Sequence, residues 1–556
     1  MKFSLWSVVC AWAFAFMFMM GAPHAVAADN DKVAAELKTI IDSGEPSIGN
    51  EDNDERIIEV YVFYAADRDY KPIWVRDNGP KAKAKEALAV FKAANEMGLN
   101  PANYRVAEIE KRMGATSPRE LAELELLLSR AFIDFGRDIN RGRVVPKTAS
   151  AENAIMAKEL GPLTLIDGAE VTESISEYVS TLEPQTREYY RLKLALAQYR
   201  EIEKKGGWPT IPKGPTLKPD MTDKRIPILR QRLMVTGDLP ADAKGDGDFY
   251  GADLVEAVKR FQARHGLTDD GVIADNTLEA MNIPIADRIR QMELNLERRR
   301  WMDDDLGDYY IFVNVADQEL KVVKNDKTIH TAKLVVGKPY SRTPVFSEKM
   351  KYIVINPYWN VPSSIANKEY LPKLKQDPGY LKRQNIRIFA GAGDDAAEVN
   401  PYSVNWKSLN RMPYSLRQDA GGKNALGRVK FMFPNRFNVY LHDTPAKSLF
   451  DKDLRVFSHG CMRVQDPLDL AALLLAGQGW DRSRIDVAVA TGKQRVVNLE
   501  KPIPVHVTYL TAWVNKDGAV NFRRDVYNRD RQLAAALSGS LPADQADVAA
   551  NAPIEE

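Results

Sequence analysis

The segment Ser458-His459-Gly460-Cys461 holds an imidazole and a thiol two residues apart. A second histidine, His442, ends a strand-like run upstream. The thiolate is the nucleophilic form of cysteine, and a neighbouring imidazole promotes its formation. If the segment is extended, His459 and Cys461 share one face, and His442 can approach from a neighbouring strand. The pattern therefore predicts nucleophilic catalysis by Cys461.

Gly460 has no Cβ, so a substrate can come close to the backbone and amide N–H groups can face a developing oxyanion. Three other fates of Cys461 stay open from the residues alone. The thiol can be a buried small apolar group, a zinc ligand with His442 and His459, or an exposed regulatory group. Structural zinc takes four ligands, usually in paired spacing, which argues against the second. The third explains neither histidine.

The N-terminus predicts export. Lys2 precedes an apolar run, 5–20, and the small-x-small triplet Ala25-Val26-Ala27 follows. This is the pattern of a secretory signal, so we expect a signal peptide over residues 1–27. The apolar run is shorter than a bilayer-spanning helix of about 20 residues, and an uncleaved membrane anchor is the alternative.

Export affects how the cysteines of the chain are interpreted. The chain has two cysteines, Cys10 and Cys461, and cleavage after Ala27 removes the first. Cysteines in exported proteins normally pair, so an unpaired Cys461 requires a reason, and catalysis supplies one.

Composition limits the class of protein. The chain has 556 residues, of which 45% are hydrophobic and 28% charged, so we expect three or four domains at roughly 150 residues each. Lys and Arg number 77 and Asp and Glu 76, so no overall field attracts nucleic acid or an anionic membrane. We therefore expect no nucleic-acid partner.

The order of patterns predicts a multidomain α+β protein. Polar, acidic residues 28–56 predict a flexible leader. Helical spacing then predicts a helical scaffold domain over 57–221, which closes in a Gly- and Pro-rich stretch. A linking helix is expected within 285–308, and the Ala- and Asp-rich residues 528–556 predict a flexible tail.

Residues 222–284 form a compact pattern of three short helices, expected at 226–233, 254–265 and 276–281. The segments Ala257–Gln262 and Asp270–Ile273 carry a resemblance to the peptidoglycan-binding-like module. The sequence departs from that pattern at Ala274, where the family usually has Gly. The alternative is a small helical spacer without a ligand.

Beyond residue 308 the apolar period changes to that of strands. We expect strands at 309–315, 319–323, 333–337, 351–356, 429–433, 437–441 and 485–489. An insertion of short helices and Gly-rich tips, about 362–425, interrupts them. An excursion of this length is usually a lid or a binding element.

His442 followed by Ser458-His459-Gly460-Cys461-Met462-Arg463 resembles the signature of the L,D-transpeptidase catalytic domain. The resemblance covers about 309–527 and includes further segments: Asn356–Pro362, Asn424–Gly427, Phe433–Asn435 and Leu441–Pro445. Together with the preceding domains, the order resembles that of the large periplasmic L,D-transpeptidases of Gram-negative bacteria. The resemblance implies a mostly-β, sandwich-like catalytic domain in the periplasm. It implies synthesis of 3-3 peptidoglycan crosslinks for cell-wall biogenesis and cell shape, inhibition by carbapenems, and no metal or cofactor.

The same resemblance implies roles for single residues. The Cys461 thiolate attacks the carbonyl before the terminal D-alanine of a donor tetrapeptide stem, with His442 as general base and then general acid. The backbone carbonyl of Asp443 orients the imidazole. Backbone N–H groups of Gly460 and Cys461 hold the oxyanion, and Ser458 belongs to the same loop.

Other residues keep two interpretations. His459 either shapes the oxyanion loop or is a packed histidine bonded to backbone. Arg463 either pairs with a stem carboxylate or forms a structural ion pair. Further candidate substrate contacts are Tyr414, Arg417 and Asn424.

The expected partners are donor and acceptor stem peptides, with glycan or other cell-wall enzymes as candidates for the helical domains. Two rival functions remain. A cysteine carboxypeptidase or peptidase passes the acyl group to water. A non-catalytic scaffold binds the wall through residues 222–284.

Overall fold

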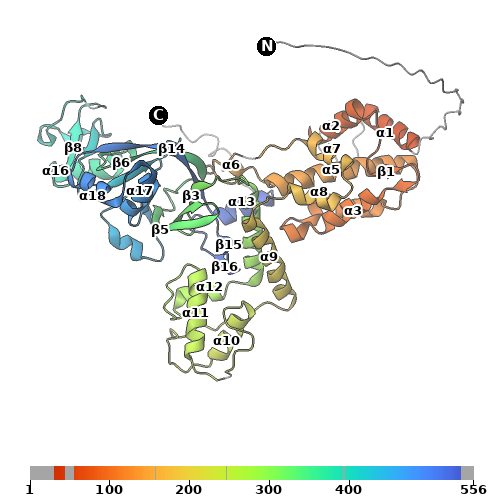
Figure 1. The fold of residues 1–556 in the computed structure, drawn as a ribbon, viewed down its shortest axis with the longest axis horizontal. Coiled ribbons are helices and arrows are strands. Elements are labelled where there is room, and N and C mark those ends of the chain that lie inside the picture. The colour runs from red at the N-terminus through yellow and green to blue at the C-terminus, as the bar shows by residue number, and fades with distance from the viewer. Residues whose placement is uncertain are drawn as a thin grey trace, which may run out of the picture. The chain divides into compact units, whose positions relative to one another are not determined.

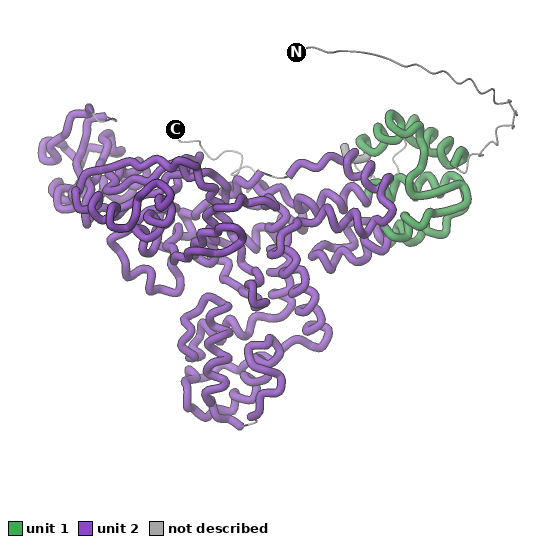
Figure 2. Tube along the Cα trace, viewed as in Figure 1, with its two compact units in different colours: residues 1–86, 107–130 green, residues 87–106, 131–556 purple. Residues whose placement is uncertain are grey.

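The computed structural model describes residues 30–43, 55–156, 158–245, 247–391, 393 and 395–539. The predicted signal, 1–27, lies outside the described residues. Contacts divide the chain into two compact units, one of residues 1–86 and 107–130 and one of residues 87–106 and 131–556 (Figure 2). Among the described residues, no helix is both long enough and apolar enough to cross a bilayer.

The first unit is mainly helical. Its elements are α1 (Asp31–Ser43), α2 (Glu55–Val62), the π-helix η1 (Phe63–Asp67), the paired strands β1 (Val75–Arg76) and β2 (Gly79–Pro80), the start of α3 (Ala82–Lys92), most of α4 (Val106–Arg112) and the first half of α5 (Pro118–Arg141).

Helix α1 corrects the prediction of a flexible leader over 28–56 for residues 31–43, while residues 28–29 and 44–54 lie outside the described part of the chain. Val33, Leu37 and Ile40 are buried along one face of the helix, at the spacing of an amphipathic helix. The N–H of Val33 also donates to Asp77 Oδ1 at 3.0 Å. The prediction rested on the polar composition of the segment and overlooked these three apolar positions.

The helical part of the second unit continues the predicted scaffold. Its elements are η2 (Ala94–Met97), η3 (Pro101–Tyr104), the second half of α5, α6 (Pro146–Ala149), α7 (Pro162–Val171), α8 (Ile175–Leu182) and α9 (Arg187–Lys204). The three predicted short helices follow as α10 (Ile226–Val235), α11 (Ala252–Arg264) and α12 (Asp275–Met281), which lie together in Figure 1. Leu229, Leu233 and Phe261 are in their common core. The predicted linking helix is α13 (Ile285–Arg300).

The C-terminal part of the second unit is mostly β, as predicted. Its main sheet contains β3 (Tyr309–Asn314), β4 (Glu319–Lys324), β5 (Lys327–Gly337), β6 (Phe346–Ile355), β10 (Val429–Met432), β11 (Leu441–His442), β12 (Val456–Ser458), β13 (Met462–Val464) and β14 (Arg495–Thr508). Their order is β12-β5-β13-β11-β10-β6-β14-β3-β4, and β4 also pairs with β5. This last pairing closes the sheet around one core.

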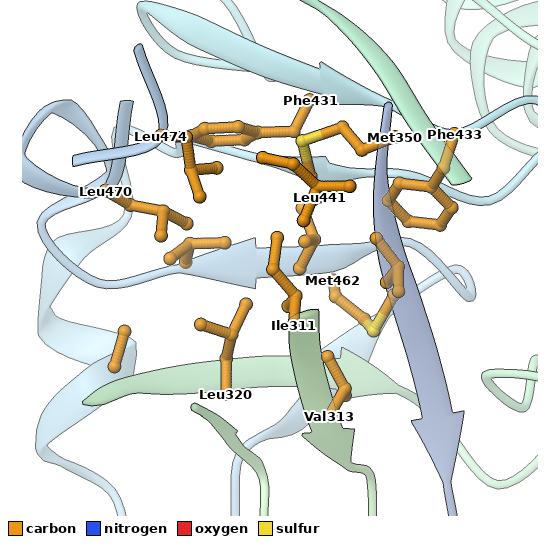
Figure 3. Packing of buried hydrophobic residues seen from close by; sticks show 14 of the residues in the cluster. Ile311, Val313, Leu320, Met350, Phe431, Phe433, Leu441, Met462, Leu470 and Leu474 are labelled. Carbon is orange, nitrogen blue, oxygen red and sulfur yellow. The ribbon is translucent and has the colours of Figure 1, made fainter. Parts of the chain in front are cut away.

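Alternate side chains of these strands fill that core. Figure 3 shows Ile311, Phe431, Leu441 and Met462 converging with Leu470 of α17 (Pro467–Leu475), and all five are fully buried. Because side chains alternate across a strand, the residue after each buried one faces the opposite side of the sheet.

The strand predicted at 485–489 is wrong, because these residues lie in helix α18 (Arg482–Ala490). The alternation of Ile485, Val487 and Val489 indicated a strand, but Val487 is 66% exposed. Asp481 caps the helix by accepting from the N–H of Arg484 at 2.8 Å. The sequence reading also missed β14, which lies between β6 and β3 and pairs with both.

The insertion of residues 362–425 forms a small folded body. It contains α14 (Ser363–Ile365), the π-helix η4 (Ala366–Tyr370), α15 (Leu371–Gln376), α16 (Tyr380–Arg383), β8 (Ile386–Phe389), η5 (Pro401–Ser403), η6 (Trp406–Ser408) and β9 (Ser415–Gln418). Strand β9 pairs with β8 and with β7 (Trp359–Asn360) at the entry to the insertion. Leu374, Ile388 and Trp406 are buried in a core of its own.

The predicted flexible tail, 528–556, is ordered over its first part. After the hairpin β15 (Ala512–Val514) and β16 (Val520–Phe522), helix α19 (Arg529–Leu537) buries Arg529 and Leu533. Arg529 Nη2 donates to the carbonyl of Thr343 at 3.1 Å. The prediction followed composition and overlooked these two anchors; residues 540–556 lie outside the described part of the chain.

The separate core of the insertion predicts local unfolding. Leu374→Ala removes a fully buried side chain, which typically costs about 2–5 kcal/mol. Amide hydrogen exchange should accelerate across α15, β8 and β9 and stay unchanged in β6 and β14. Equal acceleration in both regions would show that the insertion unfolds only together with the main sheet.

Candidate active site

Strand register places the candidate histidine between two basic side chains. Strand β11 pairs antiparallel with β10 and parallel with β13. In these registers His442 lies opposite Lys430 on one side and Arg463 on the other. Residues paired across neighbouring strands project to the same face, so the imidazole lies in a row with two cations.

The candidate nucleophile, Cys461, lies two residues before Arg463 of this row. Cys461 comes just before β13, where the N–H of Met462 donates to the carbonyl of Tyr440 at 3.1 Å. The Cys461 thiol donates to the carbonyl of Asn438, with Sγ 3.9 Å from the oxygen, and Tyr440 lies close enough to influence the ionisation of the thiol. Tyr440 and His442 are two residues apart, and their rings meet edge to face with centroids 5.7 Å apart. Cys461 and His442 therefore face the same site.

Tyr440 and Lys430 are site residues that the sequence reading missed. Lys430 Nζ lies 3.8 Å from the centroid of the Tyr440 ring. The spacing of Tyr440 two residues before His442 was the available signal, because strand neighbours at i and i+2 share a face. Lys430 carried no such signal, because only the pairing of β10 with β11 brings it there.

The strand predicted at 437–441 is mostly a turn. Only Leu441 and His442 are in β11, and Asn438 has a left-handed backbone, with φ of 51°. The side chain of Asn435 holds the turn by accepting from the N–H of Phe437 and donating to the carbonyl of Val439. The alternating apolar residues of this run describe a loop that delivers Tyr440 and His442 to the sheet.

The next residue orients His442. The carbonyl oxygen of Asp443 lies 2.5 Å from His442 Nδ1, as the resemblance implied. A carbonyl only accepts, so Nδ1 carries the hydrogen and Nε2 presents its lone pair. The Asp443 carboxylate fixes this segment by accepting from the N–H of Arg428 at 2.8 Å. A Cβ at Gly427 would lie 2.3 Å from Asp443 Cγ, which explains the glycine there.

Burial and neighbouring cations set the ionisation of the pair. Desolvation first, and then the charges of Arg463 and Lys430, lower the pKa of His442 to about 3. Burial raises the pKa of the Cys461 thiol, although Tyr440 and the charges of Lys430 and Arg463 oppose the shift. At neutral pH the site therefore holds a neutral imidazole and a protonated thiol.

The loop before Cys461 changes the predicted oxyanion site. The N–H of Gly460 donates to Ser458 Oγ at 3.1 Å, so the expectation that it is free for an oxyanion is wrong in this state. Ser458 Oγ in turn donates to the carbonyl of Cys461 at 2.5 Å. In the described part of the chain the N–H of Cys461 has no acceptor. It therefore remains available to donate to an oxyanion.

Thr343 fixes the other side of the same peptide. Its Oγ1 donates to the carbonyl of Gly460 at 2.8 Å and accepts from the N–H of Gly337 at 3.0 Å. Gly460 has φ of 115°, a conformation that L side chains rarely adopt. The backbone ahead of the nucleophile is thus held by side chains on both sides.

His459 is not the packed histidine that we considered. Its side chain is 38% exposed, and Nε2 lies 2.6 Å from Oε1 of Glu369. Glu369 is in η4 of the insertion, so this contact joins the insertion to the catalytic loop. The sequence held no signal for the pairing, because the two residues are far apart along the chain.

Arg463 stays close to the thiol. Its charge acts on Cys461, and its Nε is buried without a hydrogen-bond partner in the described part of the chain. The structural ion pair that we considered for Arg463 has no carboxylate partner among those residues.

The other candidate substrate contacts lie in the insertion or at its exit. Tyr414 packs on Trp406, with ring centroids 5.8 Å apart, and Arg417 stacks on Phe389 with its Cζ 4.5 Å from the ring centroid. Asn424 is 1% exposed, and its Nδ2 donates to the carbonyls of Pro357 and Asp419, both at 3.0 Å. These bonds assign Asn424 to the exit of the insertion, where it is not exposed to a substrate.

The described residues provide no ligand set for the zinc alternative. Among the described residues, no group of three or more histidine, cysteine, aspartate or glutamate side chains is arranged to hold a metal ion.

Three segments of the chain match family models. Residues 308–497 match the family model of the L,D-transpeptidase catalytic domain. Residues 59–196 match a scaffold domain, and residues 222–281 match a "Putative peptidoglycan binding domain". Residues 308–497 are therefore similar to L,D-transpeptidase catalytic domains, and they lie within a multidomain α+β protein.

A curated relative is similar over part of the chain. The "Putative L,D-transpeptidase" of Haemophilus influenzae is 36% identical over 248 residues, which are 44% of this chain and 49% of that protein. The chain thus spans about half the length of the curated relative that it matches.

Two solved structures also align. The L,D-transpeptidase of Xylanimonas cellulosilytica is 15% identical with a TM-score of 0.17, covering 53% of this chain and 99% of that one. The L,D-transpeptidase of Stackebrandtia nassauensis is 14% identical with a TM-score of 0.21, covering 54% and 96%.

The ionisation of the site predicts a pH profile. The raised thiol pKa means that alkylation of Cys461 by iodoacetamide should increase with pH, with a midpoint above the 8.5 or so of free cysteine. His442, with its pKa of about 3, stays neutral and should add no inflection between pH 5 and 7. An inflection in that window would indicate a thiolate–imidazolium pair in the free protein.

The double role of the Ser458 hydroxyl predicts a loss of activity. Ser458→Ala removes the acceptor for the N–H of Gly460 and the donor to the carbonyl of Cys461. Each such bond contributes about 1 kcal/mol, so the loss of both should slow acylation of Cys461 by about thirtyfold. Ser458→Thr keeps the hydroxyl and should stay close to wild type when the covalent adduct is followed by intact mass. Equal rates for Ser458→Ala and wild type would contradict the role of the loop.

Proposed function

We propose that the protein is a cysteine L,D-transpeptidase that forms 3-3 crosslinks in peptidoglycan. The observation that carries the proposal is the alignment of Cys461, Tyr440 and His442 on one face of the sheet, with Nδ1 of His442 bonded to the carbonyl of Asp443. The match of residues 308–497 supports the reaction class.

The first half-reaction forms a thioester. The Cys461 sulfur attacks the carbonyl that joins the third residue of a donor tetrapeptide stem to its terminal D-alanine, while Nε2 of His442 takes the thiol proton. We assign the N–H of Cys461 and the hydroxyl of Tyr440 as donors to the developing oxyanion. His442 then gives its proton to the departing D-alanine amine.

The neutral resting pair suits this sequence. Burial of Cys461 and His442 disfavours separated charges in the free protein, so the proton moves only as sulfur attacks. Lys430 and Arg463 stabilise the negative charge that then develops on the sulfur and the oxyanion.

The second half-reaction forms the crosslink. A diaminopimelate side-chain amine of an acceptor stem attacks the thioester, forms the new amide and releases the Cys461 thiol. The insertion acts as a lid that limits the access of water to the thioester. Its contact with the catalytic loop through Glu369 and His459 supports this role.

We also propose that the protein is exported and binds the cell wall. The signal pattern of residues 1–27 supports export to the periplasm, with a retained inner-membrane anchor as the alternative. Residues 222–281, which match a peptidoglycan-binding family, support binding to the wall. The scaffold helices are candidates for contacts with glycan or other cell-wall enzymes.

A purified tetrapeptide muropeptide tests the function. Wild-type protein should produce a crosslinked dimer and free D-alanine, and Cys461→Ala should reduce dimer formation by at least about a thousandfold, because the covalent route is lost. The products are separated by liquid chromatography and identified by mass.

The same assay decides between the rivals. Tripeptide without dimer would indicate a carboxypeptidase, and sacculus binding without any product would indicate a wall-binding scaffold. Full activity of Cys461→Ala would overturn the mechanism. Circular dichroism of the variant confirms that its fold is intact.

A further inference from the structure

Glu369 has an unusual position for an exposed acidic residue. It reaches from the insertion to the histidine two residues before the nucleophile, and its side chain is 43% exposed. Exposed ion pairs contribute little to folding stability, so stability alone does not explain this pair. Glu369 is also in a π-helical segment, a rare geometry that occurs frequently at functional sites.

The neighbours of Glu369 hold that segment in place. Ala366 is buried in the core of the insertion, and Asn367 accepts from the N–H of Met412 at 2.7 Å. Tyr370 packs on Trp359, with ring centroids 6.3 Å apart. The carboxylate is therefore presented by a fixed turn, and its second oxygen, Oε2, has no partner in the described part of the chain.

The charges around the thiol are divided between two sides. Lys430, Arg463 and the imidazole of His442 lie on the main sheet, and this side favours the carboxylates of a donor stem. An acceptor amine arrives as an ammonium ion at neutral pH, which these cations repel. The carboxylate of Glu369 is the complementary charge, and it contacts the histidine two residues before the nucleophile.

We propose that Glu369 binds the ammonium group of the acceptor and that the Glu369–His459 pair is the acceptor side of the active site. The inference rests on the proposed function, whose second half-reaction requires an amine. Oε1 of Glu369 accepts from Nε2–H of His459, which leaves Nδ1 of His459 as the basic nitrogen. Oε2 is the oxygen that receives the ammonium.

The ammonium held by Oε2 of Glu369 first gives one proton to solvent. The amine nitrogen forms a bond to the thioester carbon, and the carbon–sulfur bond breaks. The second proton of that nitrogen passes through His442 to the sulfur, so the products are an amide and the free Cys461 thiol.

The partition of the thioester between the acceptor amine and water tests the proposal. Glu369→Gln keeps the size of the side chain and removes its charge, while Glu369→Asp keeps the charge. Glu398→Gln is the matched control, because Glu398 is an exposed carboxylate of the same insertion that pairs with Arg387 at 3.2 Å. Acylation is followed by intact mass with a carbapenem, and transfer by the ratio of dimer to tripeptide from the tetrapeptide muropeptide.

Glu369→Gln should lower the dimer-to-tripeptide ratio by about tenfold, the size of a lost charge-assisted hydrogen bond, with acylation within about twofold of wild type. Raising the muropeptide concentration should restore part of the ratio. Glu369→Asp should retain more transfer than Glu369→Gln, and Glu398→Gln should match wild type.

Two results would overturn the proposal while leaving the function intact. One is an unchanged ratio in Glu369→Gln, and the other is a parallel loss of acylation and transfer, which indicates a structural role. Failure of the wild-type protein to form any Cys461 adduct or dimer would instead overturn the proposed function, and this inference with it.

Discussion

The two-residue strand β11 is hydrogen-bonded between β10 and β13, and its register determines both faces of the sheet at this point. On the inner face, Phe431, Leu441 and Met462 form a row that is fully buried in the core. One position further along, the row of Lys430, His442 and Arg463 faces the site. A shift of one residue in any of these strands would exchange the two faces, so burial of the apolar row also holds the imidazole between its cations.

This arrangement explains the electrostatics of the site. A buried histidine between two cations stays neutral, and the partly buried thiol, whose pKa is raised, stays protonated. The pair is thus suited to a proton transfer that accompanies attack, in contrast to a preformed ion pair. The carbonyl of Asp443 orients the imidazole without adding a charge, which leaves the cations free to stabilise negative charge as it develops.

The insertion adds a second body with its own core, joined to the catalytic loop by an exposed pair, Glu369 and His459. The main sheet positions Cys461, Tyr440 and His442, and the insertion places a carboxylate against the loop before Cys461. Because exposed ion pairs contribute little to stability, little of the folding energy of the insertion depends on its contact with His459.

Local sequence patterns predicted much of the fold and part of the site. The spacing of His442 and Cys461, the three short helices of residues 222–284 and most strands of the main sheet follow from residue type and period. Composition was a poorer guide: residues 31–43 and 529–537 are ordered because Val33, Leu37 and Leu533 are buried, and Val487 belongs to a helix despite its strand-like pattern. Lys430, the occupied N–H of Gly460 and the pairing of His459 with Glu369 were decided by tertiary structure alone. They depend on strand pairing and on contacts between segments that are distant in the chain. A local pattern of apolar residues does not specify which distant segment a strand or loop will contact.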